Sequence, residues 1–300
     1  MKNKDQLDVH KIHQNIRDDI QRYKPKHKFG QNFIFDEVIL SNIVNACMIK
    51  KDETILEIGS GPGTLTHELL ASGNPVVGIE IDDDLIWIAK KNLAMHNNLT
   101  IIHDDILDLD IPELLTNGIL SNSYIAVGNI PYYITQPILQ KLLRLSPKPK
   151  RIILMTQKEL ANRIVGGKNK ESFLSLLVQI YGDATKVFDL PASAFWPMPK
   201  VNSSLISITP NSNQSYSNEF IVELLSVIKI GFSAPRKQIH NVFKMSLDVE
   251  HTKLNVLLSD SDINPVLRAQ HIDLSTWIRL TKLFKMNLPE ILDELRKAYL

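Results

Sequence analysis

The chain has 300 residues, a formal net charge of +1 at pH 7 and 44% apolar residues, which is ordinary for a soluble globular protein with one large or two ordinary domains. No apolar run approaches the ~18 residues of a membrane span, and the charged N-terminus lacks the apolar core of a signal peptide. A single cysteine, Cys47, excludes an intrachain disulfide framework and a cysteine-based metal site, and we predict no metal centre. These features predict a cytoplasmic protein.

Residues 1–22 are polar, with apolar side chains at helical spacing, which predicts either a short amphipathic helix or a frayed extension. From residue 37 the pattern alternates between helices and strands. We predict buried strands at 54–59, 75–80, 99–105, 124–129 and 151–157. Repeated strand–helix units favour a parallel sheet that is covered on both faces.

The pattern changes after residue 157. Helices at 158–165 and 173–181 precede two strand-like runs at 184–188 and 203–208, which are expected to close the sheet as an antiparallel pair. A segment rich in Pro, Asn and Ser follows and suits a linker. The last ~85 residues then show helical periodicity. The predicted division is an N-terminal extension at 1–22, an α/β domain at 23–211 and a small helical domain at 212–300.

Charge is distributed unevenly along the chain. Residues 80–113 carry nine carboxylates against two lysines, whereas residues 141–170 carry nine cationic side chains against a single Glu159. The basic stretch indicates a surface that meets a polyanion, and the alternative is a solvated face without a partner.

An Asn-Ile-Pro-Tyr-Tyr sequence at 129–133 lies where the predicted strand 124–129 ends. In open α/β sheets, ligands bind outside the carboxyl ends of the strands. An amide, a main-chain carbonyl fixed by the following proline and two aromatic rings suit a flat polar base that carries an exocyclic amine. The alternative is a strand-ending turn with two half-buried tyrosines.

Glycines at 59, 61 and 63 end the first strand and open a helix, which permits a tight turn close to a ligand. The next strand ends in Glu80, whose carboxylate can accept hydrogen bonds from ribose hydroxyls. The third strand ends in Asp104-Asp105, which is placed to accept a hydrogen bond from an adenine amine. A ligand with ribose and adenine but no pyrophosphate fits this set, and S-adenosylmethionine is such a ligand. A carboxylate-rich pocket also suits its sulfonium cation. Taken singly, each carboxylate could be a solvated loop residue.

The chain resembles the RNA adenine N6-dimethyltransferases, and within them the branch that acts on small-subunit ribosomal RNA. The resemblance runs from about residue 25 to the C-terminus and includes Lys-Phe-Gly-Gln-Asn-Phe-Ile at 28–34 and Phe-Trp-Pro-Met-Pro-Lys-Val at 195–201. Its other motifs lie at 57–66, 104–107, 129–133 and 157–159. It implies a Rossmann-like methyltransferase sheet, mostly parallel with an antiparallel closing strand, followed by a small C-terminal helical domain.

The resemblance also implies roles for individual residues. The cofactor is expected to be held by Asn32, Ile34, Gly59, Gly61, Glu80, Asp105 and Asn129. Asn129 and the Ile130 carbonyl are expected to hold the target adenine amine within the Asn-Ile-Pro motif that Pro131 completes, with Tyr132 and Phe195 as aromatic walls. RNA phosphates are expected to meet Lys148, Lys150, Arg151, Arg163, Lys168, Lys170, Arg236 and Lys237.

Two positions depart from the family pattern. Asn202 replaces the usual Asp after the Val of the Pro-rich motif, and Pro235 precedes Arg236-Lys237 where an Arg is usual. The first weakens any electrostatic role at that position, and the second could shift RNA contacts without affecting catalysis.

The implied activity is S-adenosylmethionine-dependent dimethylation of the N6 amines of two adjacent adenosines near the 3′ end of 16S-type ribosomal RNA, coupled to small-subunit biogenesis. One alternative is the antibiotic-resistance branch, which modifies large-subunit RNA; Tyr133-Ile134-Thr135 and the long helical C-terminal region favour the small-subunit branch. A second alternative is an assembly factor for which methylation is secondary. The glycine spacing disfavours a third, a nicotinamide-dependent dehydrogenase. We expect a monomer.

Overall fold

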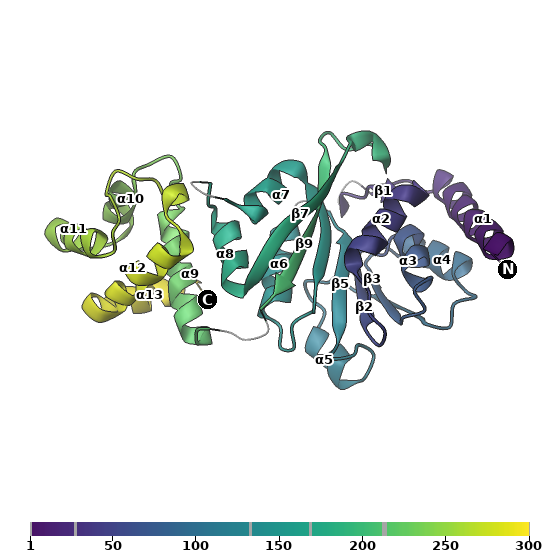
Figure 1. Ribbon diagram of the computed structural model, residues 1–300, viewed down its shortest axis with the longest axis horizontal. Coiled ribbons are helices and arrows are strands. Elements are labelled where there is room, and N and C mark those ends of the chain that lie inside the picture. The colour runs from purple at the N-terminus through teal and green to yellow at the C-terminus, as the bar shows by residue number, and fades with distance from the viewer. Residues whose placement is uncertain (1, 27–28, 132–133, 168–169, 212–214, 300) are drawn as a thin grey trace. The chain divides into compact units, whose positions relative to one another are not determined.

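A computed structural model describes residues 2–26, 29–131, 134–167, 170–211 and 215–299, with side chains described from residue 10 to residue 298 (Figure 1). Tyr132, Tyr133 and Lys168, which the sequence singled out, lie outside these described residues. The chain divides into two compact units, Met1–Ala161 with Thr185–Pro210 and Asn162–Ala184 with Asn211–Leu300. In the part of the chain that the structure describes, we find no helix long and apolar enough to cross a membrane.

The first unit is built on a seven-stranded sheet with the strand order β4-β3-β2-β5-β6-β9-β7 (Figure 1). Its strands are β2 Thr54–Ile58, β3 Val76–Glu80, β4 Leu99–His103, β5 Tyr124–Asn129, β6 Ile152–Gln157, β7 Gly182–Leu190 and β9 Ser203–Pro210. The first five are parallel, whereas β9 runs antiparallel to β6 and places Ile206 opposite Leu154. The prediction of a mostly parallel, Rossmann-like sheet with an antiparallel closing strand is confirmed.

Local sequence explains where the helices of this unit begin. Asp36, Asp82 and Asp110 cap α2, α4 and α5, because each side chain accepts backbone N–H groups that the first turn leaves unpaired. The central strands are apolar along most of their length, as expected for strands covered on both faces. The helices are α1 Lys2–Gln21, α2 Glu37–Cys47, α3 Thr64–Leu70, α4 Asp83–Asn92, α5 Ile111–Thr116, α6 Thr135–Arg144 and the first half of α7 Lys158–Val165, whose residues from Asn162 belong to the second unit.

The N-terminal residues form α1, so the amphipathic-helix interpretation is the correct one of the two. Ile16 and Ile20 on this helix are 0% and 2% exposed, and α1 packs beside α4 (Figure 1). The following segment contains β1 Phe33–Ile34, which pairs antiparallel with β8 Phe195–Trp196. Two-residue strands show no periodicity, and the sequence did not predict this pair.

The second unit is helical. Its helices are α8 Phe173–Tyr181, α9 Asn218–Gly231, α10 Ile239–Ser246, α11 His251–Asp260, α12 Leu274–Asn287 and α13 Pro289–Tyr299. The sequence did not predict α10 and α11. The core of this unit packs Trp277, Phe243 and Phe284 with leucines that include Leu176 of α8. The limits 1–22, 23–211 and 212–300 stay a prediction, although α8 packs with the second unit.

Candidate active site

A cavity of about 330 Å³ opens at the carboxyl edge of the parallel strands, where α/β folds bind their ligands. The residues that follow β2, β3, β4 and β5 line it, together with the segment around β1. Nine of the predicted site residues meet there: Asn32, Ile34, Gly59, Gly61, Glu80, Asp105, Asn129, Ile130 and Pro131. The sheet therefore brings together residues that lie far apart in the sequence.

The glycine turn between β2 and α3 requires glycine for two reasons. Gly61 and Gly63 have φ values of +57° and +94°, which L-residues with a side chain rarely adopt. A Cβ at Gly63 would also lie 2.8 Å from Leu93 Cδ1. The main chain can therefore approach a ligand closely at this turn.

Glu80 holds the glycine turn in place. Its Oε2 accepts a hydrogen bond from Gly61 N at 2.8 Å, and its Oε1 accepts from the N–H groups of Ile81 and Asp82 at 3.0 Å. Burial raises the pKa of this carboxyl, and the three hydrogen bonds oppose that shift. A carboxylate has about four acceptor positions, so capacity remains for a ribose hydroxyl.

Glu57 also lines the cavity, although the sequence analysis did not assign it a role. It is 1% exposed, and its Oε2 accepts a hydrogen bond from Thr66 Oγ1 at 2.6 Å. Burial raises the pKa of this carboxyl to about 8, so it carries a proton at neutral pH. A single carboxylate in an otherwise apolar strand was the sequence signal that could have found it.

The loop after β4 presents Asp105 and Ile106 to the cavity. Asp105 Oδ1 accepts from Leu107 N at 2.8 Å, and Lys141 Nζ donates to the carbonyls of Leu107 and Leu109 at 2.7 and 2.6 Å. Lys141, from the basic stretch, therefore fixes this loop. Ile81 lies on the same cavity and is 39% exposed, so an apolar side chain follows both the carboxylate at the end of β3 and the one in the loop after β4. Such side chains can contact a flat base.

The segment before β1 is tied to the site through Asp82. Lys26 Nζ donates to Asp82 Oδ1 at 2.8 Å, and Tyr23 Oη and Gln31 Nε2 donate to Oδ2 at 2.8 and 3.1 Å. Burial opposes ionisation of Asp82, but these hydrogen bonds hold its pKa below the ordinary value. The network places Asn32 and Ile34 against the cavity.

Asn129 closes the site at the end of β5. Its Nδ2 donates to the Asn32 carbonyl at 2.7 Å, and Asn32 Nδ2 in turn donates to the Gly30 carbonyl at 2.9 Å. The bond fixes the orientation of the Asn129 amide and leaves its oxygen as an acceptor. Ile130 follows with its side chain 2% exposed.

Phe195 does not line the cavity. Its side chain is 4% exposed and packs in the sheet core beside Ile34, its partner in the β1–β8 pair. A stacking role for Phe195 stays a prediction and requires the ring to leave this core. Asn202, which departs from the family pattern, has a local role, because its Oδ1 accepts from Ala192 N at 3.0 Å.

Arg151 is a correction to the RNA-binding set. It is 7% exposed, pairs with the buried Glu53 carboxylate, and donates to the carbonyls of Cys47 and Met48 at 2.8 and 3.0 Å. A guanidinium used in this way is a structural group, and its donors are committed to partners within the protein. The prediction failed because charge was read along the chain, whereas side-chain direction is set by the position at the start of β6.

The other predicted cations that the structure describes are more accessible. Lys150, Arg163 and Lys170 are exposed, and Lys148 is half-buried. In the second unit, Arg236 and Lys237 line a hollow of about 570 Å³ with Lys244 and Arg268. This hollow is a strongly basic surface, with Gln238 and Asn241 as its polar lining.

Taken together, the strand order, the glycine turn and the carboxylates at successive strand ends define a Rossmann-like, S-adenosylmethionine-dependent methyltransferase. Comparison with known families narrows this class, because residues 22–285 match the model of the family "Ribosomal RNA adenine dimethylase". The chain belongs to the ribosomal RNA adenine dimethylase family, and it is an enzyme of that kind.

Curated relatives are similar along nearly their whole length. The ribosomal RNA small subunit methyltransferase A of Crocosphaera subtropica is 35% identical, with 87% of this chain and 98% of the relative covered. The protein of the same name from Leuconostoc mesenteroides is 34% identical, with 86% and 89% covered. Among solved structures, a dimethyladenosine transferase from Plasmodium falciparum aligns with a TM-score of 0.70 at 27% identity, over 84% of this chain and 96% of the other.

The 23S rRNA methyltransferase ErmE aligns with a TM-score of 0.66 at 22% identity, over 84% of this chain and 98% of the other. At that identity the likeness concerns the fold.

Proposed function

We propose that this chain transfers methyl groups from S-adenosylmethionine to the N6 amines of two adjacent adenosines near the 3′ end of small-subunit ribosomal RNA, as a step of small-subunit biogenesis. The observation that carries the proposal is the fixed Asn129 amide, whose Nδ2 donates one hydrogen bond to the Asn32 carbonyl and whose oxygen is an acceptor group beside the cavity. An acceptor at that place suits an exocyclic amine.

The cavity residues fit the cofactor. Gly59 and Gly61 give a turn without side chains for its amino-acid end, Glu80 keeps acceptor capacity for the ribose, and Asp105 can accept from the adenine amine. Ile81 and Ile106 are placed to contact the faces of the base. When bound, S-adenosylmethionine supplies an electrophilic methyl group.

The protein's contribution to the reaction is to prepare the adenine nitrogen. The lone pair of that amine is delocalised into the ring, which makes it a poor nucleophile. The Asn129 side-chain oxygen and the Ile130 carbonyl can each accept a hydrogen bond from one N–H group of the adenine amine. These two hydrogen bonds favour a tetrahedral nitrogen with a localised lone pair. Positioning and fixed dipoles then provide the acceleration, and no strong base is needed.

RNA binding is assigned to the cations that remain accessible. We include the half-buried Lys148 and the exposed Lys150, Arg163, Lys170, Arg236 and Lys237, with Lys244 and Arg268 from the basic hollow, and leave out Arg151. Lys168, outside the described residues, stays in the proposed set. Tyr132, outside the described residues, stays the proposed stacking partner for the target base. A cytoplasmic monomer that meets its RNA in the ribosomal subunit completes the proposal.

The small-subunit substrate is favoured over large-subunit RNA because the two curated relatives described above, 34% and 35% identical, carry the small-subunit name, whereas the 23S rRNA methyltransferase ErmE is similar only in fold. The experiment is transfer of labelled methyl from S-adenosylmethionine to unmethylated small subunits and, in parallel, to naked large-subunit RNA, followed by nucleoside analysis. Dimethyladenosine in the small-subunit sample alone is expected. Label in the large-subunit RNA alone supports the resistance branch, and no label in either supports a binding factor.

A further inference from the structure

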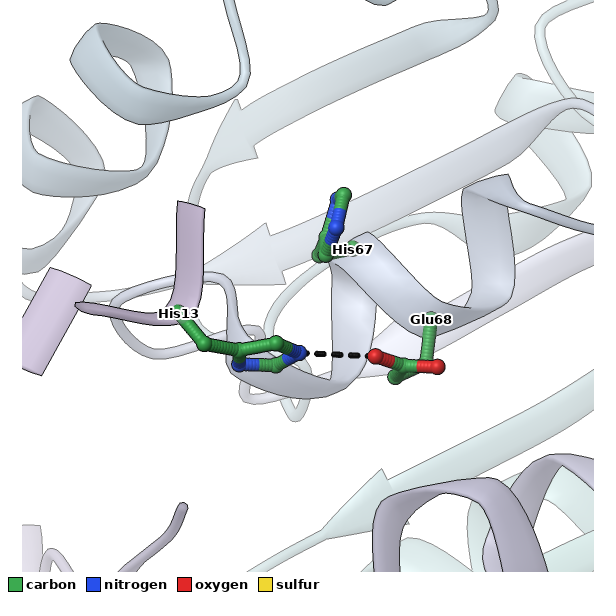
Figure 2. Close-up of side chains that lie close together, drawn as sticks. All are labelled: His13, His67 and Glu68. Atoms are coloured by element: carbon green, nitrogen blue, oxygen red, sulfur yellow. Dashed lines mark hydrogen bonds and ion pairs between the residues drawn. The ribbon is translucent and has the colours of Figure 1, made fainter. Parts of the chain in front are cut away.

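A cluster of three ligand-type side chains lies outside the active site, between α1 and α3. His13 comes from α1, and His67 and Glu68 are consecutive on α3 (Figure 2). One ring nitrogen of each histidine and one carboxylate oxygen lie within 4.8 Å of one another. His13 Nε2 is 2.7 Å from Glu68 Oε1, and Figure 2 shows the His13 ring directed at that carboxylate.

The cluster is buried and incompletely satisfied. His13 and His67 are each 5% exposed, and the Nδ1 atoms of both are buried without a hydrogen-bond partner among the described residues. The ring centroids are 5.3 Å apart in an edge-to-face arrangement. Buried imidazole nitrogens are costly to leave unpaired, so native structures usually pair them. His67 Nδ1 therefore calls for a partner that the described protein groups do not supply, whereas the His13 nitrogen that faces the cluster is Nε2, which lies against Glu68 Oε1.

The three side chains are of types that bind transition metals, because a neutral imidazole and a carboxylate each offer a lone pair to a cation. Two imidazoles and one carboxylate form a donor set that zinc accepts in proteins with a water in the fourth position.

We propose that His13, His67 and Glu68 bind one Zn²⁺ ion, with water as the fourth ligand. Zn–N and Zn–O bonds of about 2.0–2.2 Å place tetrahedral ligand atoms roughly 3.3 Å apart. The distance between His13 Nε2 and Glu68 Oε1, now 2.7 Å, must therefore increase by roughly half an ångström, and the longest distance between two ligand atoms of the cluster must decrease. Rotation of side chains about χ1 and χ2 provides movements of this size.

The ion links the N-terminal helix to the cofactor side of the fold. α3 begins at Thr64, directly after the glycine turn, and α1 leads into the segment that carries Asn32 and Ile34. A bond between α1 and α3 therefore stabilises both cofactor-binding segments at once. This role is distinct from methyl transfer, because none of the three ligands lines the active-site cavity.

The test uses the full chain, freed of metal by a chelator and titrated with zinc chloride alone in a calorimeter. We expect one equivalent to bind with a Kd of roughly 1 μM or below, and the thermal midpoint to rise with added zinc. Cobalt(II) in place of zinc is expected to give the visible absorption of a four-coordinate site.

Glu68→Gln is the decisive variant, because glutamine still accepts a hydrogen bond from His13 and so keeps a purely structural contact. We expect Glu68→Gln and His67→Gln each to weaken zinc binding by at least about 10-fold. Replacing a residue that only supports a metal ligand already lowers the affinity by about that factor, so the loss of a ligand should cost no less. The matched control is His10→Gln. His10 is an exposed histidine on the same helix, and its Nδ1 lies 2.8 Å from Glu37 Oε1, so this variant also removes a histidine–glutamate pair.

The outcomes are separable. Weakened binding in Glu68→Gln with unchanged binding in His10→Gln supports the site. Equal zinc affinity in wild type, Glu68→Gln and His10→Gln means adventitious surface binding and overturns the proposal, as does the absence of binding by the wild type. If His67→Gln does not fold, Glu68→Gln alone decides.

Discussion

Asn129 Nδ2 donates to the main-chain carbonyl of Asn32 across 2.7 Å, and the two residues are 97 positions apart in the sequence. The bond joins the end of β5 to the segment that precedes β1. It uses one of the two N–H donors of the amide and fixes the direction of the side-chain oxygen, so one interaction both closes the cavity and orients the group that we propose to hold the adenine amine.

Replacing Asn129 with Ala removes that acceptor and releases the Asn32 carbonyl. We expect kcat to fall on the order of 100-fold, as when one fixed dipole is removed from other active sites, and the cofactor Kd to rise only a few-fold. Steady-state methylation and cofactor titration measure the two. The control is Asn97→Ala, an exposed asparagine outside the cavity. Equal losses in turnover and cofactor affinity would contradict the assigned role.

Replacing Asp82 with Asn weakens the network that holds the 23–31 segment. Asparagine still caps α4, but the charge-assisted bonds from Lys26 and Gln31 are weakened or lost. We expect the cofactor Kd to rise roughly 10-fold, since a hydrogen bond to a charged group contributes about 1.5–3 kcal/mol. Calorimetry measures this. Asp83→Asn, whose side chain is 82% exposed, should have no such effect.

Replacing Arg151 with Met leaves Glu53 buried without its partner. We expect the free energy of unfolding to fall by about 3–5 kcal/mol, with the salt dependence of RNA binding unchanged. Lys150→Met is the matched control, because this neighbour is exposed and should cost no more than about 0.5 kcal/mol. A normal melting curve with reduced RNA affinity for Arg151→Met would restore it to the RNA-binding set.

The basic hollow of the second unit predicts a salt effect. Replacing Arg236 and Lys237 together with Ala should weaken RNA binding and make the slope of log K against log salt less negative by roughly 1–2. Binding to a ribosomal RNA fragment at several salt concentrations measures the slope. Lys253→Ala, on the exposed face of α11, is the control. An unchanged slope would remove this hollow from the RNA-binding surface.

The buried Glu57 carboxyl should make the stability of the protein depend on pH, with a definite sign. The folded protein keeps Glu57 protonated up to about pH 8, whereas the unfolded chain releases that proton near 4.5. The native state therefore binds more protons between these values, and its stability falls as pH rises through the window. Glutamine does not titrate and still accepts from Thr66.

We expect the stability of Glu57→Gln relative to wild type to increase from pH 5 to pH 8, by about 3–5 kcal/mol at most. Thermal melts across this range measure the difference. Glu113→Gln, which alters an exposed carboxyl on α5, should differ from wild type equally at each pH. A constant difference for Glu57→Gln as well would mean that Glu57 is ionised in the folded state.

Local patterns in the sequence determined much of the sheet and of the cofactor site. Strands β2, β3, β4, β5 and β6 were predicted to within two residues at each end, because apolar runs between helix-forming segments are decided by near neighbours. Parallel strands must end at one edge, so the order of the strands and their last residues suffice to place the glycine turn, Glu80, Asp105 and Asn129 together.

Contacts between distant segments were decided only by the tertiary structure. The pairing of Phe33 with Trp196, the burial of Arg151 against Glu53, and the approach of His13 to Glu68 each join residues that no local pattern connects. A side chain's direction and partners depend on which elements pack against it, and packing selects among many sterically allowed arrangements. The sequence therefore determined most of the chemical groups that line the cavity, whereas the packed fold decided which charges are structural and which remain available to a ligand.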